Sequence, residues 1–190
     1  MKAAEEFLNE ISNDNEEMLL LLKEAMGLVN YYRRLLERFE LDALTGLPGS
    51  NKFHDFVADL GDSGAGVGVV FFDVNGLKHY NDTKGHQAGN LLLQKASESI
   101  MHIVGAHVHA FRVGGDEFVV LTTGYNEIDI DALLAKWREK VTELNSINDG
   151  IHCSIATGVA IGAAGDKISD ILKLADERMY AEKRRMKNSM

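Results

Sequence analysis

The stretch FRVGGDEFVV, residues 111–120, places two glycines directly before two carboxylates, Asp116 and Glu117, with apolar residues on both sides. Strands usually avoid Gly and Asp, so their presence inside a good strand needs a reason. Two interpretations fit. The four residues form the tight turn of an ordinary hairpin, where Gly and Asp are common, or the turn holds two acids at a reactive site.

A third carboxylate, Asp73, ends the apolar stretch GVGVVFFDV at 66–74, which predicts a buried strand. If the hairpin lies beside this strand, three acids meet at one end of a sheet. Clustered carboxylates repel one another unless a cation lies between them, and hard oxygen ligands select Mg²⁺ or Mn²⁺. Such a metal usually also binds substrate phosphates, so the arrangement indicates phosphoryl or nucleotidyl transfer.

The segment VNGLKHYNDTKGHQAGN concentrates polar residues between this strand and a predicted helix. Backbone N–H groups around Gly76 and Leu77 could cradle phosphates, and Lys78 could neutralise them. The amides of Asn81 and Asn90 suit the edge of a base. A basic cluster at 183–187 ends the last predicted helix, but a helix C-terminus favours cations for its own dipole, so this cluster alone predicts no site.

The elements that must position these residues follow from the spacing of apolar residues. Helices are predicted over 50–60, 90–104, 130–144 and 168–187, and strands over 66–74, 107–113, 118–123 and 151–162. Ser50 is the expected N-cap of the first of these helices. The order βαββαβα, with a hairpin in the middle, is typical of an α/β (α+β) sandwich with a mixed or mostly antiparallel sheet.

Residues 1–41 predict one long helix, with apolar residues that alternate spacings of three and four. The seam consists of Leu8, Ile11, Asn15, Met18, Leu22, Ala25, Val29, Tyr32, Leu36 and Phe39. An amphipathic helix packed on its own domain would show a similar pattern. The narrow seam and charged flanks favour a dimeric coiled-coil stalk. The Pro and Gly of LDALTGLPGS then mark a loop, and we expect a globular domain over 42–190.

The composition excludes several classes of protein. No apolar run approaches the roughly 18 to 20 residues that a membrane span needs, and the acidic N-terminus is unlike a secretory signal. The single cysteine, Cys153, excludes an internal disulfide and fits a cytoplasmic location. The net charge of −9 argues against a nucleic-acid surface. It leaves a nucleotide open, because a bound divalent cation can invert the local field.

Together these segments resemble the GGDEF family of diguanylate cyclases over residues 42–187. The matching blocks are DALTGLPG (42–49), FFDVNGLKHYNDTKGHQAGN (71–90), RVGGDEF (112–118) and ADERMYAEKRR (175–185). The resemblance implies a palm-like fold, with a central, mostly antiparallel sheet wrapped by helices. It also implies condensation of two GTP into cyclic di-GMP with release of two pyrophosphates, in a homodimer whose catalytic faces meet. A coiled-coil stalk would raise the effective concentration of the two halves, and an upstream sensory domain is a possible partner.

The resemblance also implies roles for individual residues. Two Mg²⁺ or Mn²⁺ ions in each half-site would be held by Asp73, the carbonyl of Val74, Asp116 and Glu117, and Glu117 has an alternative role in deprotonating the attacking 3′-hydroxyl. The substrate would contact Gly76, Leu77, Lys78, Asn81, His86, Asn90, Arg112, Gly114, Gly115, Lys183 and Lys187. Within this set the lysines and the amides near Gly76 bind phosphates. Asn81, His86 and Asn90 form the guanine pocket, the two turn glycines make room for the nucleotide, and Arg112 supports the turn or meets the opposite subunit.

The chain departs from the family pattern at several positions. Asn90 stands where most members have Asp, so one guanine donor loses its acceptor unless the amide carbonyl turns inward. Lys187 replaces an Arg, Met186 replaces a Gly, and Gly49-Ser50 replaces Asn-Arg. The family's Arg-x-x-Asp product-inhibition site corresponds to 105–108, which here is Gly-Ala-His-Val. Three functions remain open: a diguanylate cyclase, a cyclase with relaxed base choice that makes mixed cyclic dinucleotides, and a GTP-binding regulator without catalysis.

Overall fold

The computed structural model describes residues 18–29, 31–32 and 40–188. The chain divides into two compact units, Met1–Glu40 and Leu41–Met190. In the first unit, residues 18–29 and 31–32 are helical. The other positions of the predicted stalk and its seam lie outside the described residues. Within the described ranges, no helix is both long enough and apolar enough to span a membrane.

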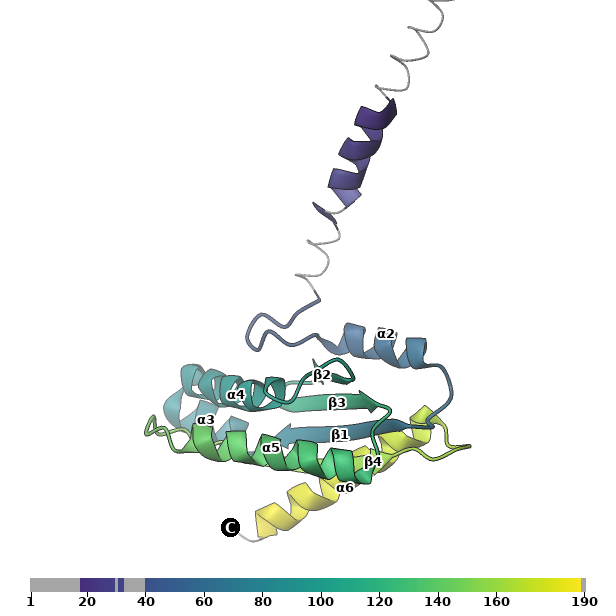
Figure 1. Ribbon diagram of the computed structural model, residues 1–190. Helices are drawn as coiled ribbons and strands as arrows, with labels where there is room; N and C mark the ends of the chain where they lie inside the picture. The colour runs from purple at the N-terminus through teal and green to yellow at the C-terminus, as the bar shows by residue number, and fades with distance from the viewer. Residues whose placement is uncertain (1–17, 30, 33–39, 189–190) are drawn as a thin grey trace, which may run out of the picture. The chain divides into compact units, whose positions relative to one another are not determined.

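The second unit is built on a four-stranded sheet in the order β2-β3-β1-β4 (Figure 1). β1 (Val67–Val74) pairs with β3 (Glu117–Thr123) on one side and with β4 (Ile155–Ile161) on the other. β2 (Val108–Arg112) pairs with β3 and completes the predicted hairpin. All three pairings are antiparallel, so the expected mostly antiparallel sheet is confirmed.

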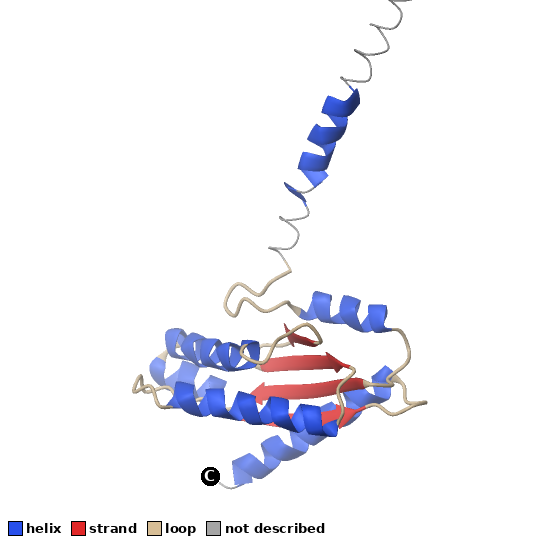
Figure 2. Cartoon of the chain, viewed as in Figure 1, coloured by secondary structure: helices blue, strands red, loops and turns tan. Residues whose placement is uncertain are grey.

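Helices cover both faces of the sheet (Figure 2). α4 (His86–Met101) and α5 (Glu127–Asn145) pack on one face, while α2 (Ser50–Leu60) and α6 (Ile168–Asn188) pack on the other. α3 (Leu77–Lys84) is a short helix that follows β1 and packs against α4. The palm-like arrangement that the sequence indicated is therefore confirmed.

The alternation of side chains along β1 supplies both cores. Phe72 joins the core under α4 and α5, where its ring lies 5.0 Å from that of Trp137. Val69 joins the other core, with Phe53 of α2 and Ile171 of α6. Because successive strand residues point to opposite faces, the odd-numbered residues of β1 face α2 and α6.

Two local expectations need correction. Ser50 is the first residue of α2 rather than its N-cap, because Gly49 takes the N-cap position in an extended conformation and bridges to Arg112 of β2. The polar segment after β1 is mostly helical, and α4 begins at His86 rather than at Asn90. Gly85 separates α3 from α4 with a φ of 83°, a left-handed value that favours glycine.

Candidate functional site

Asp73 and Glu117 lie directly opposite each other on β1 and β3. Residues opposite each other in an antiparallel pair point to the same face, with Cβ atoms about 4.5–5.5 Å apart. By the alternation along β1, this is the face that α6 covers. The sequence expectation that the hairpin lies beside the first strand therefore holds, and it brings two carboxylates together at the end of the sheet.

The turn between β2 and β3 is fastened to the end of β1. The N–H groups of Val113 and Gly114 donate to the carbonyl of Glu117 at 3.0 and 3.3 Å. The carbonyl of Asp116 accepts the N–H of Val74 at 2.9 Å. The backbone of the Gly-Gly-Asp-Glu segment is thus fixed beside the strand that carries the third acid.

Arg112 supports this turn with its guanidinium. It donates to the carbonyls of Gly114 and Gly115 at 3.2 and 2.6 Å, and to Asp42 Oδ1 at 2.8 Å. Burial alone would raise the pKa of Asp42, but hydrogen bonds from Thr45 and Arg112 hold that pKa below its ordinary value. Support of the turn is one of the two roles expected for Arg112, and contact with an opposite subunit stays a prediction.

Gly114 leaves room for the Glu117 side chain. A Cβ added to Gly114 would lie 2.6 Å from Glu117 Oε2 and 3.3 Å from its Cβ. A Cβ on Gly115 would meet no atom within 4 Å. Neither glycine has a positive φ, so backbone conformation does not require them. The structure therefore explains why position 114 is a glycine by the space that the Glu117 side chain needs. The expected collision of a side chain at 114 or 115 with a nucleotide stays a prediction.

Asp73 is the most buried of the three acids, with 3% of its surface exposed. Its Oδ2 accepts a hydrogen bond from Lys183 Nζ of α6 at 2.5 Å. Its Oδ1 is buried and has no hydrogen-bond partner among the described residues. Burial raises the pKa of Asp73 above its ordinary value, although the ammonium of Lys183 opposes the shift. A buried carboxylate oxygen without a partner costs free energy, so this atom could accept a ligand.

Glu117 also has a raised pKa. Burial is the main cause, and the carboxylates of Asp116, Asp73 and Asp176 add to it. Lys183 acts in the opposite direction. The four acids and one lysine therefore share one electrostatic environment, in which a further cation would relieve the repulsion between the acids.

We expect Glu117→Gln to gain stability over the wild-type protein as the pH rises. The folded-state pKa of Glu117 lies above its ordinary value of 4.5, so its favourable contribution is complete below that value and is lost as the pH rises through the folded pKa. The free energy of unfolding should be measured by urea denaturation, in the presence of chelator, from acidic to neutral pH. The difference between Glu117→Gln and the wild-type protein should be near zero at acidic pH and should grow to a plateau as the pH rises. A constant difference, or one of opposite sign, would contradict the shift.

The predicted phosphate-binding residues surround the start of α3. Gly76 is its N-cap in the left-handed conformation, with a φ of 79°. Leu77 is the first helical residue, and Lys78 is exposed. A helix N-terminus presents free N–H groups to an anion. No side chain among the described residues caps the N-terminus of α3, so its N–H groups are available to such a ligand. Tyr80 and Lys84 tie α3 to the loop after α5, through the N–H of His152 at 2.9 Å and the carbonyl of Gly150 at 2.6 Å.

The predicted base-reading residues lie on α3 and α4. Asn81 packs so closely on Gly89 that a Cβ there would overlap its Oδ1. His86 and Asn90, in the first two turns of α4, are exposed. These residues follow the end of β1, but none of their described contacts joins them to the carboxylates. Their role in base recognition stays a prediction.

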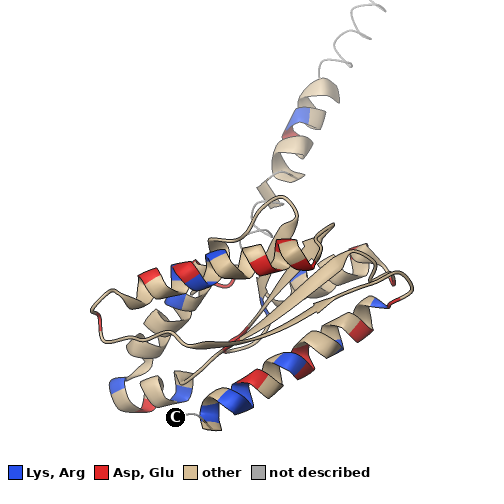
Figure 3. Ribbon diagram, turned by 60° about the horizontal axis from the view of Figure 1, so that its bottom comes forward, with Lys and Arg blue, Asp and Glu red and all other residues tan. Residues whose placement is uncertain are grey.

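Basic residues gather toward the end of α6 (Figure 3). Lys183 reaches Asp73, and Lys187 is close enough to lower the pKa of the same carboxyl. The sulfur of Met186, also on α6, accepts a hydrogen bond from the side-chain amide of Asn75 at 3.5 Å. The basic cluster is therefore not simply a solvated helix end, because at least one of its members points to the acids.

The donor set suits a hard divalent cation whose coordination is completed by a substrate. Among the described residues, no three His, Cys, Asp or Glu side chains form a ready-made metal site. Mg²⁺ is usually held by one or two carboxylates plus substrate phosphates rather than by an all-protein cage. The facing carboxylates of Asp73 and Glu117, with an unpartnered oxygen on Asp73, fit that pattern.

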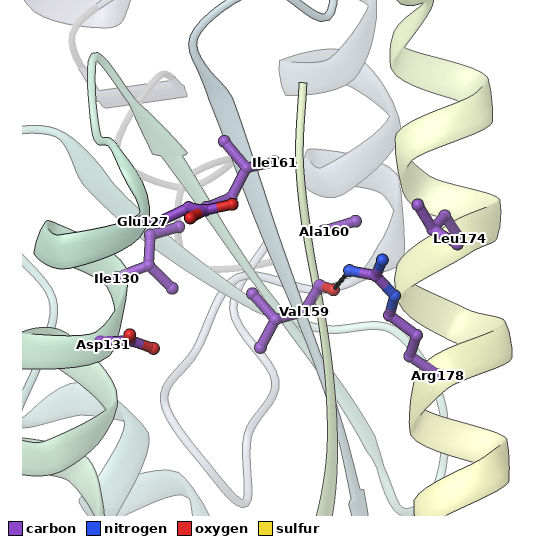
Figure 4. A pocket seen from close by; sticks show the side chains of 8 residues that line it. All are labelled: Glu127, Ile130, Asp131, Val159, Ala160, Ile161, Leu174 and Arg178. Atoms are coloured by element: carbon purple, nitrogen blue, oxygen red, sulfur yellow. Dashed lines mark hydrogen bonds between the residues drawn. The ribbon is translucent and has the colours of Figure 1, made fainter. Parts of the chain in front are cut away.

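A cavity of about 290 Å³ lies elsewhere, at the free edge of β4 (Figure 4). α5 and α6 flank it, and Arg178 donates to the carbonyl of Val159 at 2.5 Å. Glu182 accepts from the N–H and hydroxyl of Thr157 on the same strand. These α6 side chains cover backbone groups that an edge strand would otherwise expose. The cavity shares no residue with the predicted site.

Three polar side chains around the site were given no role from the sequence. Asp42 anchors Arg112, Asp176 raises the pKa of Glu117, and Asn75 bonds to Ser154 Oγ at 3.3 Å. All three lie inside the matching blocks of the sequence. Their partners are distant along the chain, so only the fold shows what they touch.

The fold and the site define a palm-like α/β domain with facing acids at the end of its central strand. The family model described as "Diguanylate cyclase, GGDEF domain" matches residues 39–189. The chain belongs to this family, as its sequence blocks indicated.

Related proteins differ in their activities. Diguanylate cyclase DosC of Escherichia coli (strain K12) is 29% identical over 189 residues, which cover 96% of this chain and 40% of DosC. Cyclic di-GMP phosphodiesterase PdeR of the same strain is 30% identical over 162 residues, covering 80% of this chain and 24% of PdeR. The chain therefore spans two fifths or less of these two relatives.

Solved structures share the fold. The coiled coil and GGDEF domain of DgcB from Caulobacter crescentus, in complex with c-di-GMP, has a TM-score of 0.70 at 23% identity, covering 86% of this chain and 92% of that one. Diguanylate cyclase SiaD from Pseudomonas aeruginosa, in complex with its activator SiaC, has a TM-score of 0.64 at 22% identity, covering 97% and 76%. At these identities the similarity concerns the fold alone.

Proposed function

We propose that this chain is the catalytic domain of a diguanylate cyclase that condenses two GTP into cyclic di-GMP. One observation carries the proposal: Asp73 and Glu117 face each other beside a Gly-Gly turn, and Lys183 of α6 pairs with Asp73. Family membership supports GTP as the substrate, and the acids that the chemistry needs are all present.

In the proposed reaction the 3′-oxygen of each GTP attacks the α-phosphorus of the other. A new P–O bond forms, and the bond between the α-phosphorus and the oxygen that bridges it to the β-phosphorus breaks. Pyrophosphate leaves with the electron pair of that bond. The proton of the 3′-hydroxyl goes to Glu117 or to solvent. A raised pKa makes Glu117 a better proton acceptor near neutral pH than an ordinary glutamate, so both of its expected roles stay open.

Asp73, Asp116, Glu117 and the carbonyl of Val74 are the residues that would hold Mg²⁺ or Mn²⁺, two ions in each half-site. Such ions would stabilise the negative charge that develops on the transferred phosphoryl group. Lys78, Lys183 and Lys187 would add fixed positive charge for the triphosphate, and the N–H groups at Gly76 and Leu77 would donate to it.

Two copies of the chain are needed, because each would hold one GTP. Met18, Leu22, Val29 and Tyr32, which belong to the predicted seam, are between 55% and 61% exposed in the single chain. A second helix packed on this seam would bury them, and the resulting coiled coil would hold two catalytic domains at high effective concentration. An upstream sensory domain would act through this stalk.

The direct test is to incubate the purified chain with GTP and Mg²⁺ and to identify the products by mass spectrometry. We expect cyclic di-GMP and pyrophosphate, and loss of both in Asp116→Ala. Tight GTP binding without pyrophosphate release, at protein concentrations that support dimers, would identify a GTP-binding regulator instead.

We expect Asn90→Asp to increase the preference for GTP over ATP by about tenfold. A carboxylate accepts from both guanine donors, whereas the Asn90 amide presents one acceptor and one donor, and an unpaired donor costs about 1–3 kcal/mol. The measurement is competition between GTP and ATP, with the ratio of cyclic di-GMP to mixed cyclic dinucleotide as readout. Asn51→Asp, the same change at an exposed position of α2, is the matched control. Equal ratios in all three proteins would exclude a role for position 90.

We expect no product inhibition through residues 105–108. Gly105 and Val108 close a tight turn with backbone bonds of 3.1 and 3.2 Å, and the turn carries neither an Arg nor an Asp. Val108 is only 2% exposed, so the carboxylate of the family motif would be buried here. Initial rates with added cyclic di-GMP should fit competition with GTP alone. A non-competitive component that Ala106 or His107 substitutions remove would contradict the prediction.

A further inference from the structure

Lys183 occupies one of the two carboxylate oxygens with which Asp73 could hold a metal ion. Its Nζ is 2.5 Å from Asp73 Oδ2, and this is the described ion pair of the Asp73 carboxylate. The other carboxylate oxygen has no hydrogen-bond partner among the described residues. An ammonium and a divalent cation on one carboxylate repel each other, so the ammonium of Lys183 at Oδ2 opposes the binding of a metal ion to Asp73.

The buried position explains why Asp73 needs a cation at all times. Its side chain is 4% exposed, and a buried carboxylate without a counterion is strongly unfavourable. In the protein without metal or nucleotide, the lysine supplies this charge. A bound metal ion would also supply positive charge beside Asp73, so the carboxylate would no longer need Lys183 as its counterion once the metal is present.

The lysine is also able to leave. Its side chain is 23% exposed, against 4% for its partner, and a four-carbon stem allows the ammonium to turn toward solvent. The helix itself is fixed, because the backbone of α6 contacts Gly158 of β4 and Glu182 bonds to Thr157. The ammonium can therefore exchange between the buried acid and the surface while α6 stays in place.

We propose that Lys183 is an internal cation that occupies Asp73 until the metal–nucleotide complex binds, and then moves from the carboxylate to the triphosphate. This inference rests on the metal and GTP sites of the proposed function. It adds an order of binding: the metal binds weakly to the free protein and enters together with the nucleotide, whose phosphates accept the displaced ammonium. The site is then protected from holding a metal without substrate.

The test is Mn²⁺ binding to the full chain without nucleotide, followed by electron paramagnetic resonance. Lys183→Met keeps the length of an unbranched apolar stem and removes the competing charge. We expect this variant to bind Mn²⁺ about tenfold more tightly than the wild-type protein, since a hydrogen bond to a charged group must no longer be broken. Lys183→Met should also bind a non-hydrolysable GTP analogue with Mg²⁺ more weakly than wild type, so the two affinities change in opposite directions.

Lys173→Met is the matched control. It removes the same charge from the same helix, but Lys173 is 76% exposed and has its described ion pair with Glu177 at 3.9 Å. Its Mn²⁺ affinity should equal that of the wild-type protein. Adding Asp73→Asn to Lys183→Met should abolish the tighter binding, which locates the metal at Asp73.

Unchanged or weaker Mn²⁺ binding in Lys183→Met, with the control unchanged, would overturn the proposal. If Lys183→Met does not fold, Lys183→Gln, which keeps a donor but removes the competing charge, must also bind Mn²⁺ more tightly than the wild-type protein. The metal assay needs neither GTP nor turnover. If the wild-type chain makes no cyclic di-GMP but Lys183→Met binds Mn²⁺ more tightly, the proposed activity is refuted and the proposed role of Lys183 as an internal cation is supported.

Discussion

Replacing Asp73 with asparagine is expected to lower the rate of cyclic di-GMP formation by about a thousandfold, which is the scale of losing one preorganised charge contact in a transition state. The amide of asparagine has the same shape as the carboxylate, but it carries no charge and presents one donor. Its neutral carbonyl binds a divalent cation more weakly than a carboxylate, and it forms no ion pair with Lys183.

The same change should leave the fold at least as stable as before. Burial raises the pKa of Asp73, so ionising this carboxyl costs more free energy in the folded than in the unfolded protein, and removing the charge removes that cost. Thermal unfolding followed by circular dichroism should give a Tm no lower than that of the wild-type protein. Activity that is lost together with the folded signal would instead identify Asp73 as a structural residue.

Asp59→Asn is the matched control for this prediction. It makes the same chemical change at an exposed position of α2, outside the proposed metal and nucleotide sites. We expect its cyclase rate and Tm to equal those of the wild-type protein. If Asp73→Asn kept more than a tenth of the wild-type rate, a catalytic metal at Asp73 would be excluded.

The sequence alone predicts the sheet strands and the hairpin because both depend on local patterns. Apolar alternation locates β1, and the Gly-Gly-Asp-Glu turn locates the hairpin. Once β1 and β3 are neighbours, their antiparallel register decides whether Asp73 faces Glu117. A slip of one residue would have put the two carboxylates on opposite faces, and no local signal reports the register.

The contacts that complete the site join residues far apart in the chain, and sequence patterns do not show such pairings. Lys183 is predicted to be near phosphates from family resemblance, but its ion pair with Asp73 depends on where α6 crosses the sheet. The bond between Arg112 and Asp42 depends in the same way on the path of the loop before α2. Both contacts are tertiary, and each joins residues that are at least 70 positions apart in the chain.

The position of α6 depends on one glycine in β4. A Cβ on Gly158 would overlap the carbonyl oxygen of Ala175 and the backbone nitrogen of Met179. A rotamer change cannot relieve contact with backbone atoms, so Gly158→Ala must push α6 away from the sheet. We expect a loss of about 3 kcal/mol or more in the free energy of unfolding, at the upper end of overpacking effects, measured by urea denaturation.

Gly105→Ala is the control, because a Cβ at that glycine would meet no atom within 4 Å and its φ is not positive. Gly158→Ala should also lose cyclase activity, since a displaced α6 carries Lys183 away from Asp73 and Glu182 away from Thr157. Stability and activity then fall together, whereas Asp73→Asn loses activity alone. A Gly158→Ala protein with wild-type stability would mean that α6 packs on β4 less closely than the overlap requires, and the position of Lys183 over Asp73 would lose its structural basis.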